Sequence, residues 1–268
     1  MDNYRTSSLF HFTNKKNNIK NILKEGLKPN FAKETNLDGF VIGMPMISAC
    51  DIPITRTKTI QRYGSYALGF TKEWGIENGF NPIHYVQGKI FEIALERLNR
   101  INQVTLKKFE EKSVGNASSD TQYVDYTNNS QYELSELYDI YNYTNTSRAF
   151  TKPYYGKSKD GKEIVNYDEN EWRYITPILT PNNWLWGDDN YKIWRGDVKK
   201  TKPKSIFDPL KFKVNDITFI LLQFENQIPD LVNCISNLDT LAGDAISEED
   251  KKILMTKIVS FERIKKDF

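Results

Sequence analysis

The sequence predicts one α+β domain over residues 1–268, with helices flanking a split, mixed β-sheet. Apolar runs of strand length, at 40–54 and 216–224, occur in the same chain as segments with apolar residues at helical spacing, such as 90–111. No internal repeat or low-complexity tract interrupts them. Because 268 residues can bury a sizeable core, a single core of mixed elements is expected.

The N-terminal part opens with a predicted strand, LFHFT at 9–13. An amphipathic helix follows, because Ile19, Leu23 and Leu27 fall on one face, and Gly26 ends it. The next elements expected are a buried strand and turn at 40–54, a helix at 55–61, a strand at 66–74, a short helical turn within 72–80 and a third buried segment at 81–86.

The middle of the chain favours one or two helices over 90–111 and a second helix over 131–143. Between them, 111–130 is rich in Ser, Asn and Gly, which predicts a polar surface insertion. A hairpin-like excursion around Lys159, Asp160 and Gly161 then returns into a strand.

The C-terminal part combines an aromatic loop at 181–196, a strand at 216–224 and a helical segment at 226–268. Ser247 is the expected N-cap of a terminal helix that docks on its own sheet. The alternative is a partner-binding helix. The basic run 195–204 is predicted to be a solvated loop, with contact to a phosphate backbone as the alternative.

The composition restricts compartment and partners. With 15 Phe, 15 Tyr and 5 Trp the chain should fold. Its net charge of +2 indicates no overall electrostatic attraction to nucleic acid or to a membrane surface. The first residues lack a signal peptide, and no run of about 18 apolar residues occurs, so we expect a cytoplasmic protein without a membrane partner. Cys50 and Cys234 are expected to be buried, reduced thiols, with no metal site.

Several common catalytic motifs are missing from the sequence. It contains no GxxxxGK, GxSxG, HExxH or CxxC, which removes the usual kinase, hydrolase and metalloprotease interpretations. Any histidine acid or base must be His11 or His84, and His84 between two apolar residues is expected to be structural. For His11 the alternative to a catalytic role is a structural one, in the core or at the edge of the sheet, with its ring hydrogen-bonded to the backbone.

The stretch NYDENEWRY at 166–174 places acidic residues against a predicted strand. Glu171 and Arg173 are two apart and share a strand face, so they can form a structural ion pair with Trp172 buried opposite. The other interpretation is a carboxylate that lines a cleft. An ion pair would keep Glu171 ionised in both cases, so pairing alone does not decide between them.

A series of motifs carries a resemblance to a known family. It runs LFHFT, NILKEGLKP, YGSYALGFTKEWGIENGFNPIHYV, YDENEWRY and the tail LMTKIVSFERIKKDF, with TKEWGI and EWRY as its most specific parts. Over nearly the whole chain this order resembles the AbiGi family of abortive-infection phage-resistance proteins. The resemblance implies an antitoxin-like partner of a nucleotidyltransferase-type toxin, or of another defence protein, in a two-gene system.

A second resemblance concerns the opening strand, HFT, and the helix that follows it, IxxILxxG. The pair is similar to the start of DNA-modifying ADP-ribosyltransferases of the DarT type. That resemblance implies an ADP-ribosyltransferase-like split sheet that binds NAD, as a substrate, in a cleft. His11 and Thr13 match the motif that meets the nicotinamide ribose, and Phe12 and Ser48 are assigned to the same cofactor site.

The same resemblance implies the remaining site residues. Tyr63 or Tyr66 would supply the aromatic ring that stacks on the nicotinamide, and Glu171 would be the catalytic glutamate that holds the ribose 2'-hydroxyl. An arginine that the DarT-type pattern places after the second strand has no counterpart in matching context, the nearest being Arg56 and Arg62.

Three functions from different classes follow. The first is an anti-phage enzyme that transfers ADP-ribose from NAD to a nucleic-acid or protein target. The alternative is a non-catalytic antitoxin that restrains its toxin through surface contacts, and a third option is a protein that binds NAD as a signal. They differ in whether His11 and Glu171 must meet in one cleft open to water.

Overall fold

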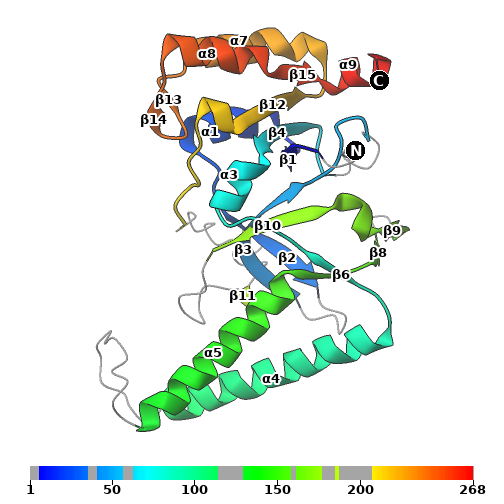
Figure 1. The fold of residues 1–268 in the computed structure, drawn as a ribbon, viewed down its shortest axis with the longest axis vertical. Helices are drawn as coiled ribbons and strands as arrows, with labels where there is room; N and C mark the ends of the chain where they lie inside the picture. Colours follow the sequence, from blue (N-terminus) through cyan, green and yellow to red (C-terminus); the bar gives the residue numbers. More distant parts are fainter. Residues whose placement is uncertain are drawn as a thin grey trace, which may run out of the picture.

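The computed structural model describes residues 6–35, 41–56, 63–113, 129–157, 161–176, 185–186 and 207–267. A nine-stranded mixed sheet forms its centre (Figure 1). The strands of this sheet are β1 (Ser8–Thr13), β2 (Asn30–Thr35), β3 (Val41–Cys50), β4 (Tyr66–Thr71), β5 (Asn81–Pro82), β10 (Glu171–Ile175), β11 (Leu185–Trp186), β12 (Ile217–Leu222) and β15 (Ile258–Ser260). The helices are α1 (Lys16–Glu25), α3 (Lys72–Glu77), α4 (Lys89–Ser113), α5 (Asn129–Ala149), α7 (Ile228–Ser236), α8 (Glu248–Thr256) and α9 (Phe261–Asp267). The predicted α+β class with a mixed sheet is confirmed.

The strands follow the order β15-β12-β4-β1-β3-β10-β5, and β2 and β11 pair with β3 outside this path. Strands β12 and β15 are parallel, whereas β1, β3, β4 and β10 pair antiparallel. Strand β1 pairs with β4 along its whole length, but its pairing with β3 consists of Phe10 opposite Cys50. The sheet therefore opens between β1 and β3 at the level of His11.

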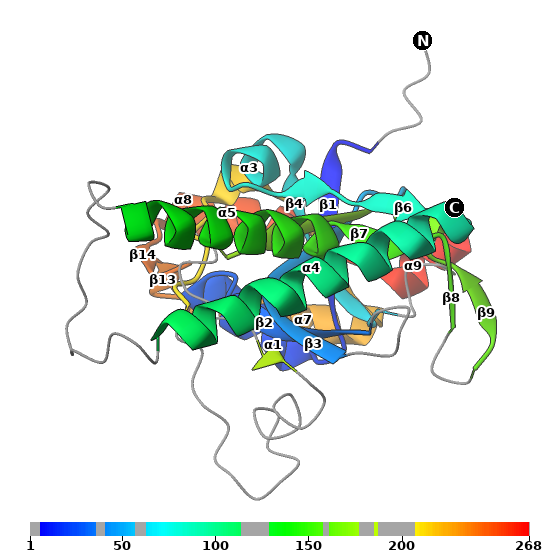
Figure 2. The ribbon, with the colours of Figure 1, turned by 90° about the horizontal axis from the view of Figure 1, so that it is seen from below.

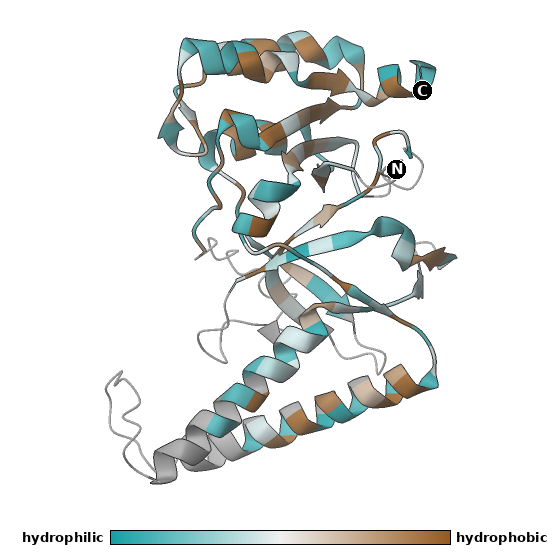
Figure 3. Cartoon of the chain, viewed as in Figure 1, coloured by the Kyte–Doolittle hydropathy of each residue, from teal (hydrophilic) through white to brown (hydrophobic). Residues whose placement is uncertain are grey.

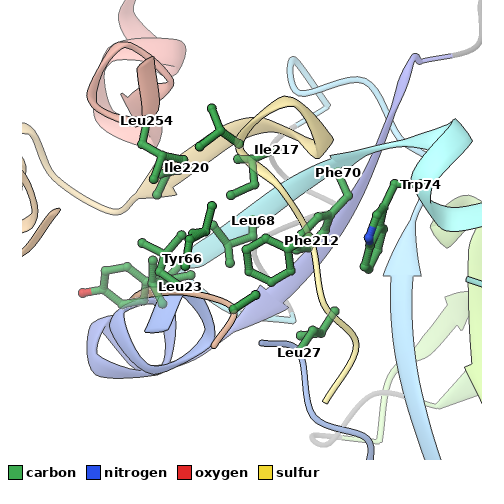
Figure 4. Packing of buried hydrophobic residues seen from close by; sticks show 14 of the residues in the cluster. Leu23, Leu27, Tyr66, Leu68, Phe70, Trp74, Phe212, Ile217, Ile220 and Leu254 are labelled. Carbon is green, nitrogen blue, oxygen red and sulfur yellow. The ribbon is translucent and has the colours of Figure 1, made fainter. Parts of the chain in front are cut away.

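The main hydrophobic core lies between one face of the sheet and helices α1, α7 and α8 (Figure 4). Ile19 and Leu23 of α1 are buried there, as their helical spacing predicts, and Gly26 ends the helix with a positive φ of 91°. A smaller cluster on the other face contains Phe10. Leu9 and Phe10 fall in different clusters because neighbouring residues of a strand point to opposite faces.

Helices α4 and α5 form a hairpin that projects from the sheet (Figures 1 and 2). The spacing at 90–111 predicts one helix or two, and the structure has one, which extends to Ser113. Of the predicted insertion at 111–130, residues 114–128 lie outside the described part of the chain. The hairpin is joined to the sheet by β6 (His84–Val86) and β7 (Thr151–Pro153), which pair in parallel.

The segment 226–268 contains helices α7, α8 and α9, but it also returns to the sheet as β15. Ser247 is the N-cap of α8, where its hydroxyl accepts a hydrogen bond from the backbone N–H of Asp250. The remaining short elements are β8 (Tyr155–Lys157), β9 (Glu163–Val165), β13 (Thr240–Leu241), β14 (Asp244–Ala245) and the 3₁₀ turns η1 (Asn166–Glu169), η3 (Val214–Asp216) and η4 (Glu225–Gln227).

Two local predictions differ from the structure. The segment 81–86 is buried only in part: Ile83 is buried, but Asn81, Pro82 and His84 are exposed, and β5 and β6 are short. The acidic stretch before β10 is a 3₁₀ turn that ends at Asn170 in the left-handed conformation.

Other predictions have mixed outcomes. The hairpin around 159–161 is confirmed by the pairing of β8 with β9. Residues 57–61 of the helix predicted at 55–61 lie outside the described part of the chain, as do most of the aromatic loop at 181–196 and the whole basic run at 195–204. In the part of the chain that the structure describes, no helix is both long enough and apolar enough to cross a membrane.

Candidate functional site

Glu171 is the first residue of β10 and is 5 % exposed. It lies directly opposite Cys50, which in turn lies opposite Phe10 on β1. Residues paired across a sheet point to the same face, and neighbours along a strand point to opposite faces. The side chains of Glu171 and Phe10 therefore share one face, and the side chain of His11 leaves β1 on the other.

The Glu171 carboxylate has a hydrogen-bond donor at every acceptor position it offers. Its Oε1 accepts from the Ser48 hydroxyl at 2.8 Å and from Arg173 Nε at 2.7 Å. Its Oε2 accepts from Arg173 Nη2 and from Lys152 Nζ, each at 3.1 Å. A carboxylate has about four acceptor sites, so these contacts leave none for the hydroxyl of a ligand.

Arg173, on the same strand, is 1 % exposed and connects three elements to Glu171. Its Nη2 also donates to Glu34 Oε1 on β2 at 2.9 Å, and its Nη1 donates to the carbonyl of Ala149 at the end of α5. A guanidinium presents its donors in a fixed plane. Arg173 therefore fixes β2, β10 and the end of α5 relative to one another.

Lys152 on β7 completes the cluster. Its ammonium lies 2.7 Å from Glu169 Oε2 and 3.1 Å from Glu171 Oε2. We call Glu34, Lys152, Glu169, Glu171 and Arg173 the Glu171 ion network. Ser48 and Arg173 belong to β3 and β10 of the main sheet, whereas Lys152 reaches in from the small β6–β7 pair at the base of the helical hairpin.

The network controls the protonation of its members. Burial alone would raise the pKa of Glu171, but Arg173 and Lys152 hold that pKa down, at about 2. Burial alone would lower the pKa of Lys152, but Glu171 and Glu169 raise it above its usual range. Glu171 is therefore ionised at neutral pH, and its attraction to two cations offsets its burial.

His11 lies where β1 and β3 separate. Its Nδ1 is 2.9 Å from the carbonyl oxygen of Ser48, and because a carbonyl only accepts, Nδ1 carries the hydrogen and Nε2 keeps a lone pair. Burial lowers the pKa of His11, although the Ser48 carbonyl opposes this, so the ring is neutral at pH 7. The sequence left open the alternative that His11 is hydrogen-bonded by the backbone, and the structure shows such a contact.

A pocket of about 490 Å³ opens on the His11 side of the sheet. His11, Thr13 and Ser48 line it together with polar residues of α1 and β2, among them Asn18 and Asn30. Among the described residues, Glu171 is not part of this lining. Ser48 stands between the two groups, with its carbonyl toward His11 and its hydroxyl toward Glu171.

The aromatic residues assigned to the cofactor site lie apart from this pocket. Phe12 and Tyr63 pack on the cluster that contains Phe10, on the other face of β1. Tyr66 is buried in the main core, where its hydroxyl accepts a hydrogen bond from Gln227 Nε2 at 2.9 Å. The structure thus brings His11, Thr13 and Ser48 together and places Glu171 in a separate ion network.

Three members of that network were not found from the sequence. Glu34, Lys152 and Glu169 come from β2, β7 and the turn before β10, and the first two carry no local pattern that sets them apart. Glu169 lies within the acidic stretch, but its partner Lys152 is 17 residues away. The i, i+2 spacing of Glu171 and Arg173 was the available signal, and it correctly predicted the ion pair.

A family model described as "Putative abortive phage resistance protein AbiGi, antitoxin" matches residues 19–223. A protein of Lactococcus lactis subsp. cremoris named "Abortive phage resistance protein AbiGi" is 23 % identical over 244 residues, which cover 84 % of this chain and 89 % of that protein. No solved structure matches the chain.

Proposed function

Because the chain belongs to the AbiGi family of abortive phage resistance proteins, we propose that it is the antitoxin of an abortive-infection system and restrains a toxin by binding it. The description of the family model supports this role in phage defence. The observation that carries the proposal within the molecule is the state of Glu171, whose carboxylate is buried and fully hydrogen-bonded by the protein itself.

The argument against turnover is geometric. A glutamate that holds a ribose hydroxyl must offer it a lone pair, and interactions that accelerate a reaction must strengthen in the transition state. The four donors at Glu171 use the acceptor sites that such a hydroxyl would need. Glu171 is better suited to joining strands than to catalysis, and a protein that works by binding does not need it free.

Growth of bacteria tests the proposed role. The chain expressed alone is expected to leave growth unchanged, and the nucleotidyltransferase-type toxin that the family resemblance implies is expected to arrest growth. Expression of both should restore growth, and the two proteins should co-purify. Arrest of growth by this chain alone would contradict the antitoxin role.

The second candidate function is an ADP-ribosyltransferase that uses NAD. The observation in its favour is the open pocket lined by His11, Thr13 and Ser48, because the Ser48 hydroxyl also donates to Glu171. On this hypothesis Lys152 would have to leave Glu171, since it is the donor that does not come from the main sheet. Its departure would free one acceptor site for the ribose.

Nicotinamide release separates the candidates. With NAD and the chain alone, the antitoxin proposal predicts no release above buffer from the wild type, from Lys152→Met or from Glu171→Gln. Release by Lys152→Met that the further change Glu171→Gln abolishes would favour a latent transferase. Heat of NAD binding in calorimetry without nicotinamide release would instead favour NAD as a signal.

A further inference from the structure

The helical hairpin carries an unusual share of exposed apolar side chains. Of the twelve large hydrophobic residues that are exposed in the described part of the chain, seven lie on α4 and α5. Four on α4, namely Ile90, Ile93, Ile101 and Val104, are 80 %, 39 %, 46 % and 50 % exposed, and we call them the α4 stripe. Figure 3 shows hydrophobic residues recurring along this helix. Exposed apolar residues gathered in this way mark an interaction surface.

The spacing of the stripe shows that these residues form one face. At about 100° per residue, its four members fall within roughly 80° of the helix circumference. Leu98 and Thr105 lie on a different side of α4, and the structure buries Thr105 and half-buries Leu98. Helix α4 therefore uses one side to pack within the protein and leaves a second apolar side in solvent.

A pocket adjoins the stripe at the base of the hairpin. It has a volume of about 500 Å³ and lies between α4 and the segment around β6. Ala94, which is next to Ile90 on the helix surface, belongs to its lining, together with Tyr85, Phe91 and Tyr167. A stripe with an aromatic pocket beside it fits an amphipathic helix with a large apolar anchor residue.

The charged residues beside the stripe indicate the charge of the partner surface. By helix geometry, Lys89, Arg100 and Lys107 line one edge of the stripe, and Arg97 lies within it. All four are exposed. The exposed acid Glu96 lies about 20° beyond Lys89 and Lys107, and Glu92 lies farther round the helix, so cations are in the majority at this edge. The complementary surface is apolar with an acidic edge.

We propose that the α4 stripe and its adjoining pocket bind the toxin, through an amphipathic toxin helix with an acidic edge. This inference rests on the proposed antitoxin function and names the surface that performs it. The stripe lies on a projection outside the main core (Figures 1 and 2). A partner can therefore cover it without any change in the sheet or in the Glu171 ion network.

Titration calorimetry with the purified nucleotidyltransferase-type toxin of the proposed system tests the surface. We expect Ile101→Glu/Val104→Glu to weaken binding at least about 100-fold, because two carboxylates would be buried in an apolar contact. The control, Ile76→Glu/Ile253→Glu, changes two exposed isoleucines on α3 and α8, away from the hairpin, and should bind as the wild type does. Circular dichroism melting confirms that both variants are folded.

A second pair of variants tests the acidic edge of the partner. Arg97→Glu/Arg100→Glu should weaken binding at least about 10-fold, and added salt should weaken the wild-type complex. The matched control is Arg263→Glu/Lys266→Glu, which makes the same change of charge at α9. If both pairs of substitutions weaken toxin binding equally, the inference that the partner has an acidic edge facing α4 is overturned.

The outcomes separate this inference from the function on which it rests. If the wild type does not bind the toxin, the antitoxin function itself is contradicted. If the wild type binds and the α4 variants bind equally well, the function stands and the surface is wrong. A third outcome is that Ile101→Glu/Val104→Glu still binds the toxin but no longer forms a dimer, or no longer binds anionic phospholipid vesicles, as the wild type does. The stripe would then bind a second copy of the chain or a membrane surface, and the proposal would be overturned.

Discussion

Replacing Arg173 by methionine is expected to lower the free energy of unfolding by about 3–5 kcal/mol, because a buried ion pair that loses one partner leaves the other charge uncompensated. Arg173 is among the largest fully buried side chains, and it donates to Glu171, Glu34 and the Ala149 carbonyl. A domain of this kind has a total stability of roughly 5–15 kcal/mol. Urea unfolding followed by circular dichroism measures the difference.

A surface arginine provides the control for this substitution. Arg263 Nε lies 2.7 Å from Glu225 Oε1, the same distance that separates Arg173 Nε from Glu171 Oε1, but both partners of the surface pair are exposed. Solvent screens such a pair, so Arg263→Met should leave the unfolding curve nearly unchanged. Similar effects of the two substitutions would show that burial does not give the Glu171 ion network its importance.

The Glu171 ion network is also expected to make stability fall at acid pH. The pKa of Glu171 is lowered from an ordinary 4.5 to about 2, since Arg173 and Lys152 outweigh the effect of burial. A carboxyl with a depressed pKa in the folded state contributes stability above its unfolded pKa and loses that contribution as pH falls through the folded one. The contribution is about 3 kcal/mol at neutral pH and should disappear between about pH 4.5 and pH 2.

The measurement compares the wild type with Glu171→Gln. Other carboxylates titrate in the same window, so the difference between the two unfolding free energies isolates Glu171. That difference should be largest near pH 6 and shrink steadily toward pH 2. Parallel curves across this range would mean that Glu171 gains nothing from its ionised form in the folded protein.

Much of the fold was predictable because it is encoded locally. The helical spacing of Ile19 and Leu23 and the stop at Gly26 predicted α1, and the apolar run at 216–224 predicted β12. Strand β2 was missed, because its sequence, NFAKET, shows neither an apolar run nor clear alternation. Strand β15 was read as helix because three residues between two helical segments give no separate signal.

The candidate site was less predictable, since it depends on strand register. The sequence placed His11 and Glu171 on strands, but it did not reveal that Phe10 and Glu171 both lie opposite Cys50. That register sends the side chains of His11 and Glu171 to different faces. Lys152 likewise reaches Glu171 through the parallel pairing of β6 with β7, a contact between segments whose order the sequence does not reveal. The ion pair between Glu171 and Arg173 was predictable because both residues belong to one strand.

The link between the hairpin and the Glu171 ion network gives the network a structural purpose. Helix α5 ends at Ala149, whose carbonyl accepts a hydrogen bond from Arg173, and Lys152 follows three residues later. The network therefore anchors the base of the hairpin to the sheet. On this account the bond from Arg173 to the Ala149 carbonyl holds the base of the hairpin, and Glu171 takes part in no reaction.

Growth rescue by Lys152→Met/Glu171→Gln tests that account most directly. This pair removes one positive and one negative charge together, so the net charge of the network is unchanged while the Glu171 carboxylate is lost. If the chain neutralises its toxin by binding, cells that express the toxin and this variant should grow as well as cells with the wild type, provided that melting shows the variant to be folded. A folded variant that no longer rescues growth would contradict the account and return Glu171 to the active chemistry of the protein.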